Sequence, residues 1–163
     1  MQDSFLHSAG KKVWLPGGMA TEALVAYGKG AVKFEKYYSG SKIENVDKVT
    51  EFVNEVLEEK ECPLKVQMQL DVAIDEIFGN IAYYAYGKGS GNATIQIEME
   101  DNPPKITLIF IDQGIPYNPL ENKDPDITLD IEDREIGGLG IFLVKKTMDE
   151  LSYEYVDGTE YLI

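Results

Sequence analysis

Three polar side chains at helical spacing, inside an otherwise apolar segment, have the chemistry needed for metal binding and proton transfer. Glu76, Asn80 and Tyr84 are four residues apart, so a carboxylate stands beside a carboxamide on one face of a helix. A carboxylate can accept the proton of an attacking hydroxyl, and an amide oxygen can bind Mg²⁺ together with phosphate oxygens and water. The alternative is a solvated stripe on an amphipathic helix.

A glycine-rich segment further along the chain is suited to holding phosphates. Gly137, Gly138 and Gly140 begin an apolar helical pattern, where backbone N–H groups and the positive end of the helix dipole can approach a polyphosphate. The one arginine of the chain, Arg134, stands three residues earlier, and arginine is well suited to phosphate oxygens. Tight packing at a cramped helix start is the competing explanation for these glycines.

Asp112 ends an apolar run that reads as a central strand, and Gly114 follows it. A carboxylate there can accept a hydrogen bond from an exocyclic amine such as that of adenine, while glycine leaves room for the ring. The alternative is that Asp112-Gln113-Gly114 simply forms an Asx turn.

The elements that must position these residues follow from periodicity and turn signals. We expect helices at Ile43–Leu57, Leu64–Tyr86 and from Gly137 to about Leu151, and strands at Ala31–Tyr38, Ala93–Glu100, Ile106–Ile111, Ser152–Val156 and Thr159–Ile163. The pattern predicts an α+β fold, a two-layer α/β sandwich with a mostly antiparallel, mixed sheet and helices packed on one face. Residues 1–30 are poorly patterned, with a short helix expected at Met19–Tyr27. Tyr117 to Ile136 is acidic and aperiodic, as is typical of a lid.

The composition favours one globular domain that stays out of the membrane. The chain has 163 residues, of which 44% are hydrophobic and 27% charged. No apolar run approaches the roughly 18 residues that a membrane span needs. The N-terminus lacks the basic-then-apolar layout of a signal peptide, so a cytoplasmic location is expected.

Charge and scarce reactive residues exclude several kinds of site. The net charge of −14 argues against a nucleic-acid partner, although it is compatible with a nucleotide bound together with Mg²⁺. Cys62 is the only cysteine, which excludes an intrachain disulfide and a multi-cysteine metal site. His7 is the only histidine and lies in the N-terminal tail, which excludes mechanisms that need a histidine in the folded domain.

Taken in order, three segments of the chain resemble the N, G1 and G2 boxes of the GHKL, or histidine kinase-like, ATPases. They are Glu76-Ile-Phe-Gly-Asn80 with Tyr84-Ala85, Asp112-Gln-Gly-Ile-Pro116 and Gly137-Gly-Leu-Gly-Ile-Phe-Leu-Val144. The last box, followed by Met148-Asp149-Glu150, is most similar to the bacterial anti-sigma factor serine/threonine kinases. The resemblance covers about Ile43 to Ile163. It implies a GHKL (Bergerat) ATP-binding domain at residues 31–163 with a lid at about 117–136, after an N-terminal extension at 1–30.

The resemblance also implies a role for each matching residue. Glu76 would be the general base, Asn80 the Mg²⁺ ligand and Asp112 the adenine reader. The remaining positions would surround ATP: Gly114 at the base, Gly137, Gly138 and Gly140 at the phosphates, Arg134 at the terminal phosphate and Thr159 beside adenine. The family's usual histidine, four residues after the asparagine, is Tyr84 here, which puts any role of that histidine in doubt.

The resemblance implies an ATP- and Mg²⁺-dependent protein serine/threonine kinase. Its substrate would be a serine on a small anti-sigma factor antagonist protein. It would also sequester a sigma factor, regulate transcription by partner switching and form a homodimer. An alternative is an ATP-gated protein-binding module of the same fold without phosphotransfer. A third reading is an acidic scaffold domain without a ligand. Glu76 discriminates the first two, since a general base is needed only for transfer.

Overall fold

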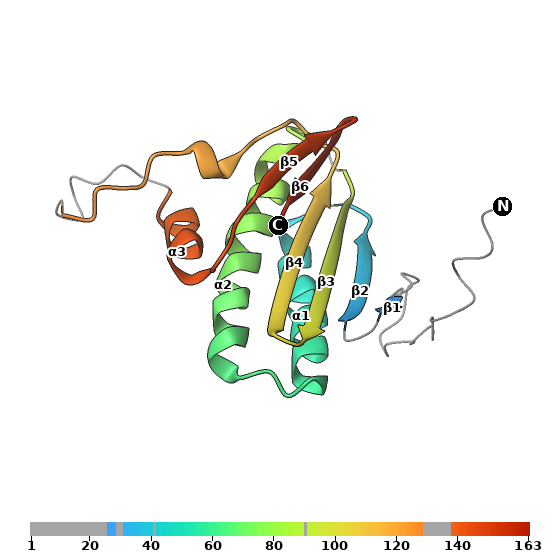
Figure 1. The fold of residues 1–163 in the computed structure, drawn as a ribbon. Helices are drawn as coiled ribbons and strands as arrows, with labels where there is room; N and C mark the ends of the chain where they lie inside the picture. The colour runs from blue at the N-terminus through green and yellow to red at the C-terminus, as the bar shows by residue number, and fades with distance from the viewer. Residues whose placement is uncertain (1–25, 29–30, 41, 90, 129–137) are drawn as a thin grey trace.

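A six-stranded antiparallel sheet is the central element of the computed structural model, which describes residues 26–28, 31–40, 42–89, 91–128 and 138–163 (Figure 1). In spatial order its strands are β1 (Ala26–Gly28), β2 (Ala31–Tyr38), β3 (Ala93–Asp101), β4 (Pro104–Asp112), β6 (Thr159–Leu162) and β5 (Tyr153–Val156). The α+β sandwich is confirmed. The expected mixed character of the sheet is not seen, since every strand pairing among the described residues is antiparallel.

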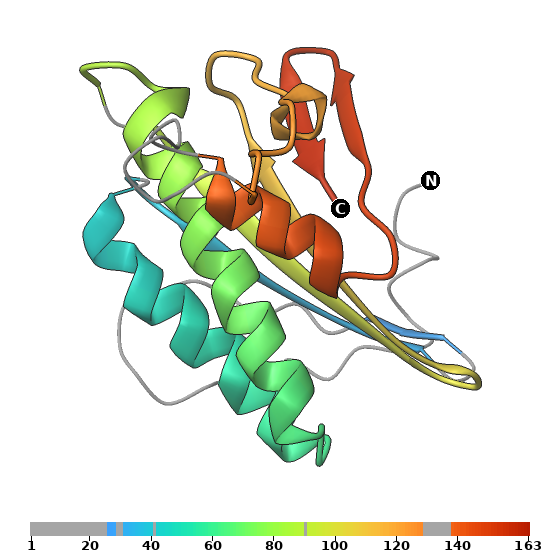
Figure 2. The ribbon, with the colours of Figure 1, turned by 90° about the vertical axis from the view of Figure 1, so that its left-hand side faces the viewer.

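The helices α1 (Val46–Glu59), α2 (Leu64–Asn80) and α3 (Leu139–Thr147) cover one face of this sheet (Figure 2). A short 3-10 turn, Ile43–Asn45, leads into α1. In α1 the apolar stripe that includes Val49, Phe52 and Val56 is buried, while the acidic residues between them face solvent. Burial of this stripe is the main reason that α1 is stable, because propensity alone rarely holds a helix of this length.

Alternation along β3 and β4 directs one set of side chains toward the helices. Ile95 and Ile97 of β3 and Phe110 of β4 are buried in the core. Asp112 follows Phe110 by two residues, so it lies on the same face of the sheet as the core. A carboxylate is thereby carried to the end of a buried strand, directly under the helical layer.

The C-terminal end of the second helix widens into a π-helix at Ile81–Ala85, which directly follows α2. The expected helix at Leu64–Tyr86 is therefore confirmed, but with an unpredicted wider last turn. The carbonyl oxygen of Ala85 accepts a hydrogen bond from the amide of Ile115 at 2.6 Å. This bond fixes the loop after β4 against the helix, and π-turns of this kind are frequent at functional sites.

The C-terminal hairpin brings a second polar residue to the same region. Asp157 and Gly158 have φ of 51° and 81°, as a tight two-residue turn requires, so the predicted hairpin is confirmed. The register of β6 on β4 pairs Glu160 with Asp112. Two acidic side chains therefore lie opposite each other on neighbouring strands.

Two expected elements differ from the structure. α3 ends at Thr147, because Met148 is extended, and this lets Met148 and Leu151 pack against the core. Ala26–Gly28 is a strand and not the end of a helix, since it pairs with the edge of β2. The rest of the helix expected at Met19–Tyr27 lies outside the described residues. Within the described residues no helix combines the length and apolarity needed to cross a membrane.

Candidate functional site

A pocket lies between the end of α2, the end of β4 and the β5–β6 hairpin. Its walls are mostly apolar, with a few polar groups: Ile77, Asn80, Ile81, Tyr84, Ala85, Phe110, Asp112, Ile115, Tyr117, Pro119, Tyr153, Glu160 and Leu162. Apolar walls with a few convergent polar groups are typical of a small-molecule site. Asn80 and Asp112, which the sequence predicts for one site, do line one pocket.

Asp112 is the buried carboxylate of this pocket, with 6% of its surface exposed. Its Oδ1 accepts a hydrogen bond from the Gly114 amide at 2.8 Å, so the Asx turn considered above is present. Burial, with a further contribution from the charge of Glu160, raises the pKa of Asp112 to about 6, while the Gly114 amide opposes this shift. A carboxyl group with such a pKa changes its charge close to neutral pH.

Glu160 is the second buried acid of the pocket, also 6% exposed, and no sequence motif identified it. Its Oε1 accepts hydrogen bonds from the Tyr153 hydroxyl and from the Tyr117 amide, both at 2.5 Å. Thr159, which the resemblance assigned to the adenine site, does not line the pocket, and its Oγ1 lies 3.5 Å from Gln113 Nε2. Alternation along the last strand would have put Glu160 and Leu162 on one face, but only the pairing with β4 shows which face.

Glu76 lies against the first turn of α3. A Cβ added at Gly140 would overlap the carboxyl group of Glu76, so glycine lets this side chain lie against α3. Gly138 adopts the left-handed conformation, with φ 82°, at the N-cap. The first turn of α3 has no acidic residue of its own.

The comparison with known proteins agrees with this geometry. The sequence model of the histidine kinase-like ATPase domain matches residues 40–162, which is more than half of the chain. The chain belongs to this family.

Three proteins with sequences similar to part of this chain are protein kinases. The serine/threonine-protein kinase BtrW of Bordetella bronchiseptica is 28% identical over 98 residues, which cover 60% of this chain and 68% of BtrW. The serine-protein kinase RsbW of Listeria monocytogenes is 28% identical over 98 residues, and RsbW of Listeria innocua over 99 residues. In both of these comparisons the match covers 58% of this chain and 62% of RsbW, so the chain spans less than two thirds of the RsbW length.

The structure brings together some, but not all, of the residues predicted from the three boxes of this histidine kinase-like ATPase domain. Asn80 and Asp112 share the pocket, while Glu76 lies one helical turn away at Gly140. Tyr84, at the place of the usual histidine, lines the pocket and is 65% exposed. The other predicted phosphate-side residues, Arg134 and Gly137, lie outside the described residues.

The glycine of the G1 box is fixed by packing. A Cβ added at Gly114 would overlap the backbone of Ala85 at the end of the π-helix. Tyr86, which sequence reasoning missed, supports the same loop, since its hydroxyl accepts from the Gln113 amide at 2.9 Å and donates to the Asn92 carbonyl at 2.6 Å. No pattern in the sequence connects Tyr86 to the G1 box, because the contact depends on how the π-turn ends.

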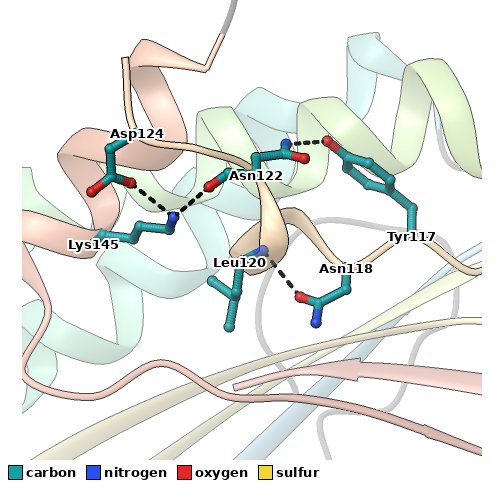
Figure 3. A network of polar contacts seen from close by, with 6 residues as sticks. All are labelled: Tyr117, Asn118, Leu120, Asn122, Asp124 and Lys145. Atoms are coloured by element: carbon teal, nitrogen blue, oxygen red, sulfur yellow. Dashed lines mark hydrogen bonds and ion pairs between the residues drawn. The ribbon is translucent and has the colours of Figure 1, made fainter. Parts of the chain in front are cut away.

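A polar network ties the first part of the predicted lid to α3 (Figure 3). Lys145 Nζ donates to Asp124 Oδ1 at 2.9 Å and to the Asn122 carbonyl at 3.1 Å. The Asn122 side chain in turn donates to the Tyr117 hydroxyl at 2.5 Å. The network connects a pocket residue, Tyr117, with the helix that Glu76 contacts.

No cluster of three or more His, Cys, Asp or Glu side chains suited to a metal occurs in the described ranges. A metal in this pocket would therefore depend on Asn80 and on oxygens supplied by a ligand. Mg²⁺ accepts such an arrangement, because it retains several waters and commonly binds through substrate phosphates.

Proposed function

We propose that this chain is an ATP- and Mg²⁺-dependent protein serine/threonine kinase that phosphorylates a small anti-sigma factor antagonist protein. The observation that carries the proposal is the meeting of Asn80 and buried Asp112 in one apolar pocket, with Glu76 one helical turn away at the start of α3. The relatives BtrW, a serine/threonine-protein kinase, and RsbW, a serine-protein kinase, support it.

The base end of the pocket suits adenine. Ile81, Phe110 and Leu162 provide apolar surface for the ring, and Asp112 is an acceptor for the exocyclic amine. The amide of Ile115, bonded to the Ala85 carbonyl, holds the loop in place before a ligand arrives. Thr159 remains a predicted contact of the adenine site through its hydroxyl.

The phosphate end suits a negatively charged group. The first turn of α3, with Gly138 and Gly140, offers backbone N–H groups and the positive end of the helix. Gly137 would extend this cradle, and Arg134 would contact the terminal phosphate. Asn80 would ligate Mg²⁺, which supplies charge neutralisation for the phosphates when bound. Glu76 would accept the proton of the substrate serine as its hydroxyl oxygen attacks.

The protein partners follow from the same proposal. Phosphorylation of the antagonist would control whether the chain sequesters a sigma factor, so that transcription is regulated by partner switching. The chain would act as a homodimer in the cytoplasm. Its net charge of −14 supports protein partners over nucleic acid.

The replacement Glu76→Gln tests the proposed general base. It should leave ATP binding intact and lower phosphotransfer by roughly 10²- to 10⁴-fold, because only transfer needs a proton acceptor. Calorimetry with Mg-ATP measures binding, and mass spectrometry of an anti-sigma factor antagonist from the same genome measures phosphoserine. The control is Glu100→Gln, an exposed acid near the end of β3. Undiminished transfer by the Glu76 variant would refute the assignment.

The tyrosine at position 84 favours a second candidate function for this chain, that of an ATP-gated protein-binding module. It lines the pocket where the family usually has histidine, and it is 65% exposed. In that case ATP would change the affinity for the antagonist while the wild-type chain transfers no phosphate. The same two assays distinguish the candidates, since the kinase alone yields phosphoserine.

A further inference from the structure

The two buried acids of the pocket lie on neighbouring strands. Asp112 and Glu160 are register partners on β4 and β6, each is only 6% exposed, and both line the pocket. Like charges buried this close disfavour ionisation of both groups, so Glu160 adds to the effect of burial in raising the pKa of Asp112. None of the residues that line this pocket in the described part of the chain is a lysine, arginine or histidine.

The hydrogen bonds of Glu160 fix its side chain in the pocket. Its Oε1 accepts from the Tyr153 hydroxyl and from the Tyr117 amide. The other titratable groups around the pair are Tyr84, Tyr117 and Tyr153, which line the pocket, and Tyr86 after the π-helix. These groups are phenols, so the acid pair governs the charge of the pocket near neutral pH.

We propose that Glu160 is a specificity-determining residue that reads the nucleobase together with Asp112. The inference rests on the proposed nucleotide function. An exocyclic amine carries two N–H donors, and the pair offers two carboxylate acceptors on one face of the sheet. The amine binds to ionised Asp112, so a proton held by Asp112 is released to solvent on binding. Glu160 cannot turn away, because Tyr153 and the Tyr117 amide hold it.

The proposal predicts discrimination against purines that carry an oxygen at C6. Such an oxygen is an acceptor, so it meets two acceptors where the amine offers two donors. ATP and inosine triphosphate have the same phosphates and differ in this group. We therefore expect the wild-type chain to prefer ATP roughly 10- to 100-fold above pH 7, as for a mispaired hydrogen bond to a charged group.

The preference for ATP over inosine triphosphate should decrease as the pH falls. Amine binding needs ionised Asp112, whose pKa is about 6, so affinity for ATP is lost as the pH falls through that value. Protonated Asp112 can instead donate to the C6 oxygen. The ratio of the two dissociation constants should fall roughly tenfold between pH 7 and pH 5, and titration of the phosphates cancels in this ratio.

The test is calorimetry of the full chain with each nucleotide and Mg²⁺ at pH 5, 6, 7 and 8. For wild type we expect the falling ratio, and release of a proton on ATP binding at pH 6, seen as a dependence of the heat on the buffer. Glu160→Gln should show a smaller preference, and its ratio should fall only at a lower pH than in wild type, because loss of the Glu160 charge lowers the pKa of Asp112. Glu154→Gln, an exposed acid on β5, should behave like wild type.

Two results would overturn the proposal. One is a wild-type ratio that does not change between pH 5 and pH 7, which is decisive even if the Glu160 variant fails to fold. The other is a folded Glu160→Gln variant with the wild-type preference and pH profile. Both leave ATP binding, and with it the proposed function, intact. Absence of binding by either nucleotide at every pH would refute the nucleotide site itself.

Discussion

Single residues of this site have packing roles that also place carboxyl groups. Asp112 forms an Asx turn with Gly114 and presents a buried carboxyl group to the pocket. Gly140 leaves room for the carboxyl group of Glu76 against α3. From sequence, packing and chemistry were alternative explanations for these residues. The structure shows the packing, and the proposed chemistry would use the carboxyl groups that it places.

Gly140→Ala should displace Glu76 and destabilise the fold by at most about 1 kcal/mol. The added Cβ overlaps the end of the half-buried Glu76 side chain, which can turn away, so the cost lies at the low end of the range typical of overpacking. Urea denaturation measures the free energy of unfolding. Gly79→Ala in α2 is the matched control, since nothing lies within 4 Å of its added Cβ. If Glu76→Ala does not relieve the loss in the double variant, the contact does not cause it.

Asp112→Asn should remove a destabilisation of the folded state that grows as the pH rises. The pKa of Asp112 is raised from 3.8 to about 6 in the fold, so the protonated form is favoured and stability falls as the pH rises from about 4 through 6. At roughly 1.4 kcal/mol per pH unit, the group destabilises the protein by about 3 kcal/mol above pH 6. The unfolding free energy of the variant minus that of wild type, measured from pH 4 to 8, should grow with pH. A constant difference would contradict the cause given for the shift.

At the scale of elements, periodicity predicted most of the fold. The alternation of β3 and the apolar stripe of α1 required burial of one face, so their bounds follow closely from sequence. The π-turn at Ile81–Ala85 and the early end of α3 did not follow, because each depends on a contact from elsewhere in the chain. Glu160 was missed for the same reason, since strand register is a tertiary property.

Lys145→Met should loosen the loop after β4 with little effect on global stability. The ion pair of Lys145 with Asp124 is partly exposed, and such pairs contribute at most about 1 kcal/mol. Hydrogen exchange should accelerate around Asn122 and Asp124, which the lysine joins to α3. Lys105→Met, from the more exposed pair with Glu150, should leave this loop unchanged. Equal exchange rates in both variants would mean that the network does not anchor the loop.

At the scale of the whole molecule, the N and G1 boxes contribute Asn80 and Asp112 to one pocket, while Glu76 of the N box lies against Gly140 of the G2 box. The family match begins at residue 40, yet β2 precedes it and pairs with β3 along the sheet. The alternation of apolar and polar residues at Ala31–Tyr38 predicted this strand independently of the family resemblance. An acidic chain with a net charge of −14 repels polyphosphates at long range, so the proposed nucleotide binding would depend on local groups such as the start of α3 and on a bound cation.

The most direct test of the nucleotide pocket is calorimetry of Mg-ATP with wild type and with Asp112→Asn at pH 7.5. We predict binding by wild type and a roughly 10- to 100-fold weaker affinity for the variant, because the carboxylate acceptor of the base is lost. The variant should be at least as stable as wild type at this pH, so unfolding cannot explain the loss. Asp101→Asn, at the exposed end of β3, should bind like wild type. Equal affinity of Asp112→Asn and wild type for ATP would contradict the placement of the base in this pocket.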